Sequence, residues 1–187
     1  PARLGAVLIP SVLGNTFTIK LHAGPTPFAE TLIRRGQMRP TYIYRDPRDA
    51  LLSAYEYGQR ARDAGQTNAF SPLDTLEKAI EFIAEYVHYW EQWTAIPKVH
   101  TVRYESLKTD YDAEATRLAQ FLGLDAASPP VRAVIAKYQP EQARKAERGV
   151  HFVKGVSGRF RQILTPEQQQ LCINTFGEIL VRMGYEP

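Results

Sequence analysis

The stretch YRDPRDALLSAYEY, from Tyr44 to Tyr57, joins a strand pattern to a helix pattern and decides the fold class. The run that ends at Tyr44 leans apolar and is typical of a strand. Asp46 then stands where an N-cap belongs, Pro47 at the first helical position and Asp49 in the first turn. The stretch therefore predicts a strand that passes directly into a helix ending near residue 63.

The same alternation of strand and helix patterns continues on both sides of this stretch. We expect strands at Arg3–Pro10, Thr16–His22, Pro40–Arg45 and Lys98–Tyr104. We expect helices at about 25–36, 46–63, 71–93, 111–123, twice within 130–148, and from 165 onward, with a basic, glycine-punctuated loop over 142–162. This order predicts an α/β fold with a mostly parallel central sheet flanked by helices, in one domain over residues 1–187.

Composition excludes several classes of function. The net charge of +3 is modest and the basic residues are spread along the chain, so we expect no nucleic-acid partner. The single cysteine, Cys172, forms no internal disulfide, and the histidines lack metal-ligand spacing, so we expect no metal. No apolar run reaches the roughly 18 residues of a membrane span. With no signal sequence, these features favour a cytoplasmic protein without a membrane partner.

The strand exit at Arg45 suggests an anion site. In parallel sheets, ligands bind beyond the carboxyl ends of the strands, where helix N-termini offer unpaired amides to an anion. Arg45 could hold a phosphate with its guanidinium fork, and Ser53 follows Asp46 and Asp49 at helical spacing. A well-capped helix with solvated charges explains these residues equally well.

The wider pattern resembles the sulfotransferases that use 3′-phosphoadenosine 5′-phosphosulfate (PAPS). Arg45-Asp46-Pro47-Arg48-Asp49 with Ser53 is similar to the 3′-phosphate signature of that family. The resemblance implies that Arg45 and Ser53 grip the 3′-phosphate of the donor. It also implies the P-loop-like fold of these enzymes.

Lys20-Leu21-His22 resembles the Lys-Thr-His motif of the same family. The resemblance implies that His22 is the general base for the acceptor hydroxyl, a role that imidazole fills near neutral pH. Lys20 would stabilise charge at the transferring sulfuryl group. Because some relatives use a glutamate as the base, Glu30 is the reserve candidate. Taken alone, a histidine at a strand end is also typical of a structural residue.

Two further matches follow in the family's order. Val102 to Leu107 resembles a strand-end motif whose tyrosine lies by the adenine, a role that falls here to Tyr104, although a core aromatic fits equally. Phe152 to Gly158 resembles the loop that closes over the 3′-phosphate, with Lys154 and Gly155 as the binding residues, although a flexible basic loop is the alternative. The sequence Leu164 to Gln168 then copies the family's helix start.

The chain also departs from the family pattern. Leu21 replaces a threonine, Val153 replaces an arginine, and Arg159-Phe160 replace Asp-Trp. The glycine loop that cradles the 5′-phosphosulfate is missing, since only residues 10–15 separate the first two expected strands. With Pro1 as its first residue, we expect the chain to lack its natural front.

The resemblance thus implies a PAPS-dependent sulfotransferase that moves a sulfuryl group to a hydroxyl or amine of a small-molecule or glycan acceptor. The product of the donor would be 3′-phosphoadenosine 5′-phosphate (PAP), and no metal is needed. The sequence is compatible with a homo-oligomer. The alternative is a catalytically impaired or truncated relative that binds nucleotide or has a structural role.

Overall fold

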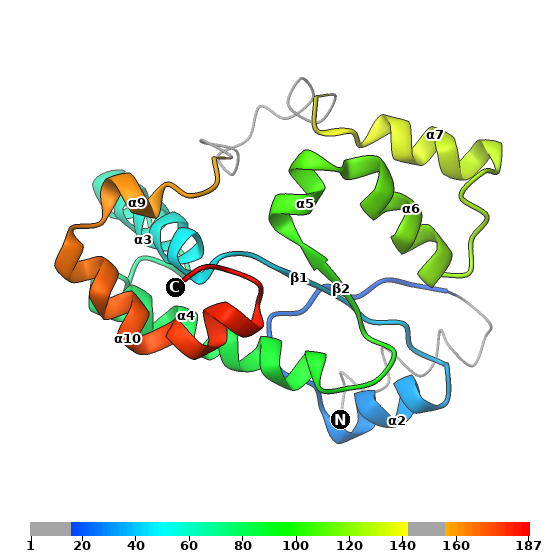
Figure 1. Ribbon diagram of the computed structural model, residues 1–187, viewed down its shortest axis with the longest axis horizontal. Helices are drawn as coiled ribbons and strands as arrows, with labels where there is room; N and C mark the ends of the chain where they lie inside the picture. Colours follow the sequence, from blue (N-terminus) through cyan, green and yellow to red (C-terminus); the bar gives the residue numbers. More distant parts are fainter. Residues whose placement is uncertain (1–15, 142–155) are drawn as a thin grey trace.

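The computed structural model describes residues 16–141 and 156–187 of the chain, and a small parallel sheet lies at its centre (Figure 1). Strand β1 (Thr41–Tyr44) pairs with β2 (His100–Arg103) so that Thr41 is opposite His100 and Tyr44 is opposite Arg103. Because the strands are parallel, both carboxyl ends meet at one edge. The predicted α/β class and the parallel pairing are confirmed.

Eight helices accompany the sheet within the described ranges. They are α2 (Pro27–Arg34), α3 (Pro47–Asp63), α4 (Leu76–Thr94), α5 (Tyr104–Thr109), α6 (Tyr111–Phe121), α7 (Pro129–Lys137), α9 (Phe160–Ile163) and α10 (Pro166–Arg182). In Figure 1, α3, α4, α9 and α10 gather on one side of the sheet, while α5, α6 and α7 gather on the other. Each strand therefore leads into a different group of helices.

Helix α3 begins as its sequence predicts. The Asp46 side chain accepts a hydrogen bond from the backbone N–H of Arg48, and Pro47 occupies the first helical position. This cap starts the helix two residues after Arg45, which fixes where the arginine side chain leaves the backbone. The residues at the junction itself, Asp46 and Pro47, thus determine where the strand ends and the helix begins.

Helix α4 begins later than the sequence suggested. The start predicted at Ser71 is wrong: residues 70–72 form turns, and Thr75 is the N-cap, accepting from the N–H of Lys78. Asn68 explains the difference, because its side chain accepts from the N–H of Phe70 and from the Ser71 hydroxyl and holds a turn there. One face of α4, with Ile80, Ile83 and Val87, is buried.

The main core lies between α3, α4, α9 and α10. Its buried members are Leu51, Leu52, Leu76, Ala79, Ile80, Ile83, Val87, Trp90, Phe160, Leu164, Cys172, Phe176, Leu180, Met183 and Tyr185. Cys172 is fully buried among them. The helix expected from residue 165 onward is confirmed as α10, which begins with a capping box between Thr165 and Gln168.

The strand predicted for Thr16–His22 does not form. This segment has neither helix nor strand, and its alternating apolar side chains Phe17, Ile19 and Leu21 are 41%, 50% and 44% exposed. A strand needs a neighbour that takes up its backbone hydrogen bonds, and the described residues place none beside it. The first expected strand, Arg3–Pro10, lies outside the described residues.

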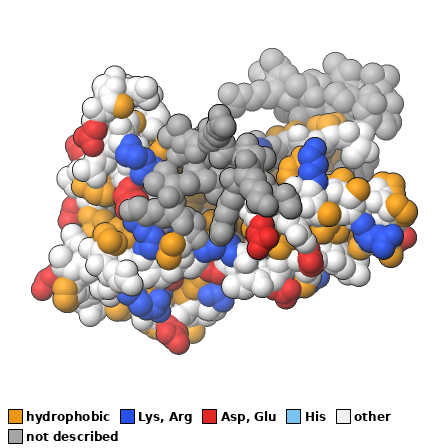
Figure 2. Space-filling view, turned by 90° about the horizontal axis from the view of Figure 1, so that it is seen from above, with side chains coloured by type: hydrophobic (Ala, Val, Ile, Leu, Met, Phe, Trp, Pro, Cys, Tyr) orange, Lys and Arg blue, Asp and Glu red, His pale blue; other side chains and the backbone are white. Residues whose placement is uncertain are grey.

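Charged side chains of both signs are interspersed on the face seen in Figure 2, where no continuous basic surface appears among the described residues. Over the same residues, no cluster of three or more His, Cys, Asp or Glu side chains is arranged to hold a metal ion. None of the helices in the described part of the chain combines the length and hydropathy that crossing a membrane requires.

Candidate functional site

Arg45 lies directly after β1 and makes three contacts that define the centre of the site. Its Nη1 donates to the Ser53 hydroxyl at 3.0 Å, and its Nη2 donates to the Val156 carbonyl at 3.1 Å. The guanidinium carbon lies 5.0 Å from the centre of the Tyr104 ring. The structure therefore brings together three sequence-predicted residues, Arg45, Ser53 and Tyr104.

One donor of Arg45 has no partner among the residues that the structure describes. The Nε atom is buried and has no hydrogen-bond acceptor among the described residues. An unpaired buried donor on a cation is costly unless an anion completes it. A phosphate beside the guanidinium would accept from the arginine, so Arg45 fits the 3′-phosphate group that the sequence resemblance implies.

Asp49 connects this arginine to the segment that follows Val156. Its carboxylate is 1% exposed and lies 3.5 Å from Nη2 of Arg45. It accepts hydrogen bonds from the backbone N–H groups of Gly158 at 2.5 Å and Phe160 at 3.2 Å. Helix α3 thereby holds a chain segment more than a hundred residues away against the strand exit.

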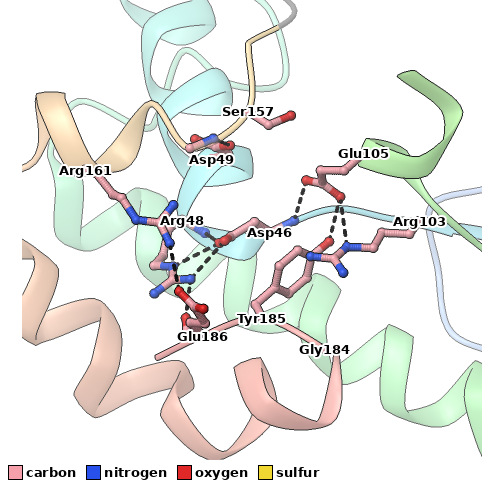
Figure 3. Close-up of a pocket in the computed structure, with 11 residues that line it drawn as sticks. Asp46, Arg48, Asp49, Arg103, Glu105, Ser157, Arg161, Gly184, Tyr185 and Glu186 are labelled. Atoms are coloured by element: carbon pink, nitrogen blue, oxygen red, sulfur yellow. Dashed lines mark hydrogen bonds and ion pairs between the residues drawn. The ribbon is translucent and has the colours of Figure 1, made fainter. Parts of the chain in front are cut away.

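A buried ion pair lies beside the site. Arg48 donates to both carboxylate oxygens of Asp46, at 3.0 and 2.9 Å, and its guanidinium stacks 4.0 Å from the ring centre of Phe160. The same guanidinium donates to the Glu186 carbonyl at 2.6 Å. A pocket of about 350 Å³ opens next to this pair, between the strand exits and the C-terminal residues (Figure 3).

The exit of β2 is tied to the exit of β1 through Glu105. Its carboxylate accepts from the backbone N–H of Asp46 at 3.3 Å and from the Tyr185 hydroxyl at 2.8 Å. Burial raises the pKa of Tyr185 well above its usual value of 10.0, and the hydrogen bond to Glu105 raises it further. The guanidinium of Arg103 covers the Tyr185 ring at 4.0 Å. The Figure 3 view shows this group converging from both strands and the C-terminus.

His22 contacts a different part of the molecule. Its ring lies 6.3 Å from the ring of Tyr86 on α4 in an edge-on arrangement, and the neighbouring Ala23 carbonyl accepts from the Trp93 indole at 2.9 Å. Lys20 is exposed. The reserve residue Glu30 lies on α2, where it pairs with Arg34 at 3.7 Å.

A row of aromatic rings leads up to His22. Successive ring centres lie 5.4, 5.6 and 5.0 Å apart through Tyr57, Phe70, Phe82 and Tyr86. Burial raises the pKa of the Tyr86 hydroxyl, which favours its neutral form. The row thus presents aromatic surface next to an imidazole.

Lys154 and Gly155, the predicted loop residues, lie outside the described residues. The described chain resumes at Val156, the residue whose carbonyl accepts from Arg45. The departure Arg159-Phe160 is accommodated here: Arg159 pairs with Glu56 of α3, and Phe160 is buried under Arg48.

Sequence reasoning missed part of this arrangement. The sequence places Asp49 in the first turn of α3, but its two bonds with the distant backbone carry no local signal. Tyr185 and Glu186 follow the last helix without any motif.

Comparison with known proteins shows which family the chain resembles. A family model described as a sulfotransferase domain matches residues 19–184. The chain is 25% identical to cytosolic sulfotransferase 3 of Arabidopsis thaliana, a match that covers 84% of this chain and 59% of that protein. It is 28% identical to luciferin sulfotransferase of Photinus pyralis, over 83% of this chain and 43% of that protein. The chain spans about half the length of these curated relatives.

Solved structures agree on the fold. A mouse sulfotransferase complexed with PAP superposes with a TM-score of 0.60 at 20% identity, covering 80% of this chain and 61% of that one. A retinol dehydratase in complex with androsterone and the inactive cofactor PAP gives 0.60 at 18% identity, covering 96% and 60%. Since the family model matches most of its length, the chain belongs to the sulfotransferase domain family.

Proposed function

We propose that this chain forms the 3′-phosphate side of the donor site and the acceptor-activating side of a PAPS-dependent sulfotransferase. The observation that carries the proposal is the contact of Arg45 with Ser53 at a strand exit, where the Nε of the arginine has no hydrogen-bond acceptor among the described residues. Two solved proteins of the same fold hold PAP, which carries the phosphate in question.

On the donor side, Arg45 and Ser53 would bind the 3′-phosphate and Tyr104 would lie by the adenine. Arg45 already covers the Tyr104 ring, so phosphate and base would be held by neighbouring side chains. Lys154 and Gly155 would complete the phosphate contacts: the lysine with a point charge and the glycine with a close backbone approach.

On the acceptor side, His22 would remove the proton of the acceptor hydroxyl or amine. The acceptor atom forms a bond to sulfur while the bond between sulfur and the 5′-phosphate oxygen breaks, and PAP leaves. Lys20 would stabilise the charge on the transferring group. No metal enters this step, because positioning and fixed charges supply the stabilisation.

The aromatic row next to His22 supports a small acceptor with an apolar or aromatic body. The rings contact one another at 5.0–5.6 Å, and an aromatic acceptor beside Tyr86 and His22 would add one more contact of the same kind. A glycan is the second acceptor class, which these rings could stack against. We further propose one domain over the chain and a cytoplasmic location, since a curated relative is named a cytosolic sulfotransferase.

Calorimetric titration with adenosine 3′,5′-bisphosphate tests the donor side. We expect binding by the wild-type chain, a loss of at least about tenfold in Arg45→Ala, and no change in Arg132→Ala, which removes an exposed arginine of α7. Undetectable binding by the wild type, or equal binding by Arg45→Ala, would contradict the proposal.

Sulfuryl transfer from PAPS to a simple phenol tests the acceptor side. We expect His22→Ala to abolish transfer while it leaves bisphosphate binding intact. Binding without any transfer by the wild-type chain would favour the non-catalytic relative described above.

A further inference from the structure

Asp49 joins the two chain segments that meet at Arg45. From α3 its carboxylate reaches the Arg45 guanidinium at 3.5 Å, and it also accepts from the amides of Gly158 and Phe160. The Val156 carbonyl in turn accepts from the same guanidinium. Arginine, carboxylate and the backbone over 156–160 thus form one closed set of contacts.

The backbone over 156–160 has the shape that these contacts need. Gly158 has φ +78°, a left-handed conformation that residues with a Cβ rarely adopt. In this conformation its N–H points to Asp49, while Phe160, 3% exposed, fixes the segment in the core. The segment is therefore held at both ends, by a carboxylate and by a buried ring.

The negative charge of Asp49 lies close to the arginine that is proposed to bind the phosphate. A negative charge at 3.5 Å from Arg45 weakens the attraction of that arginine for a phosphate. Simple electrostatics therefore predicts that neutralising Asp49 strengthens phosphate binding. The geometry predicts the reverse, because Nη1 donates to Ser53 while Val156 and Asp49 engage Nη2, so these three contacts fix the orientation of the guanidinium that a phosphate would meet.

We propose that Asp49 is a positioning residue for the 3′-phosphate: it fixes the backbone over 156–160 and holds the Arg45 guanidinium in the orientation that binds the ligand. The inference rests on the proposed donor site. In this inference Asp49 does not touch the nucleotide. A change at Asp49 should therefore alter the affinity only for the 3′-phosphate, the group that Arg45 binds.

The substitution Asp49→Asn separates the two expectations. Asparagine has the same shape, but its amide nitrogen cannot accept, so one of the two backbone N–H groups loses its partner. Titration with adenosine 3′,5′-bisphosphate and with adenosine 5′-monophosphate isolates the 3′-phosphate. We expect Asp49→Asn to lose about tenfold in affinity for the bisphosphate and less than about twofold for the monophosphate.

The matched control is Asp74→Asn, the same charge change at a half-exposed residue that pairs with Lys78. It should alter neither affinity. Equal or tighter bisphosphate binding by Asp49→Asn overturns the inference, and so does an equal loss for both nucleotides. A wild-type chain that does not prefer the bisphosphate overturns the proposed donor site itself, and the inference with it.

A measurement on the wild type covers the case in which Asp49→Asn does not fold. Hydrogen exchange of the Gly158 and Phe160 amides should slow when the bisphosphate binds, and the monophosphate should have no such effect. If the bisphosphate and the monophosphate leave the exchange rates of these amides equal, the inference is overturned without any variant.

Discussion

The guanidinium of Arg45 donates a hydrogen bond to the hydroxyl of Ser53 across two turns of α3, at 3.0 Å. The hydroxyl is oriented in turn, because it donates to the Asp49 carbonyl at 3.0 Å. Ser53 thus holds the arginine in place, and its hydroxyl can donate to an anion when its proton rotates away from the Asp49 carbonyl.

Replacing Ser53 by alanine should weaken the binding of adenosine 3′,5′-bisphosphate by about three- to tenfold, because one hydrogen bond near a charged ligand is lost. Calorimetry gives the affinity. Thr175→Ala is the matched control, since its hydroxyl donates to the Leu171 carbonyl one turn earlier in the same way, but on an exposed site of α10. Equal effects of the two substitutions would mean that Ser53 has only a local role in the helix.

Local sequence was sufficient to predict the helix starts that carry the site. Asp46-Pro47 and Thr165-Pro166 each begin a helix, and the capping side chain accepts from an N–H no more than three residues away. Because these bonds are local, the sequence alone predicts them. The start of α4 was misplaced, because Ser71-Pro72 resembles the same signal, while Asn68 holds a competing turn. Caps are predictable when one local bond pattern dominates.

Contacts between distant segments could not be predicted in this way. The alternating residues Phe17, Ile19 and Leu21 suggested a strand, but strand formation depends on a partner, which a single segment does not encode. The bonds from Asp49 to Gly158 and Phe160 likewise depend on the packing of α9 beneath Arg48. The family resemblance grouped Arg45, Ser53 and Tyr104 because it carries such tertiary information.

Arg48→Met should destabilise the fold by about 3–5 kcal/mol, because it leaves the buried Asp46 carboxylate without its cation. Arg48 is 2% exposed and Asp46 6%, so water does not replace the lost bonds. Urea denaturation measures the loss. Adding Asp46→Asn to this variant should recover part of it, so the double variant should be more stable than the sum of the single losses predicts.

The control for this ion pair is Lys78→Met, which removes the cation from the half-exposed pair with Asp74. No measurable loss is expected there. Additive losses for Arg48→Met and Asp46→Asn would show that the two side chains stabilise the fold independently.

Tyr185 should make stability fall in alkali. Its pKa is raised above 10.0 in the folded protein, first by burial, so the folded state holds the proton more tightly than the unfolded chain. Its contribution is therefore complete below pH 10 and declines as the pH rises beyond it, by at most about 1.4 kcal/mol per pH unit. Tyr42, whose pKa burial raises to about 12, adds to the slope.

Tyr185→Phe should reduce this alkaline slope and should also lower the free energy of unfolding at pH 7 by about 1–2 kcal/mol, because Glu105 loses a donor. Urea denaturation at pH values from 7 to 11 measures both effects. Between pH 7 and 9 the two proteins should differ by a constant amount, which serves as the internal control. An unchanged slope above pH 10 would exclude Tyr185 as its source.

Gly58→Ala should destabilise the protein although it replaces glycine inside a helix, a change that ordinarily gains about 0.5–1 kcal/mol. A Cβ at Gly58 would lie 2.1 Å from the carbonyl oxygen of Phe70, so α3 and the turn before α4 would have to separate. Gly177→Ala in α10 is the matched control, because its Cβ would meet only the Ile173 side chain at 3.7 Å, and it should stabilise by the ordinary amount. Urea denaturation of both variants measures the free energy of unfolding. An increase in both variants would show that the turn at Phe70 moves aside with little loss of stability.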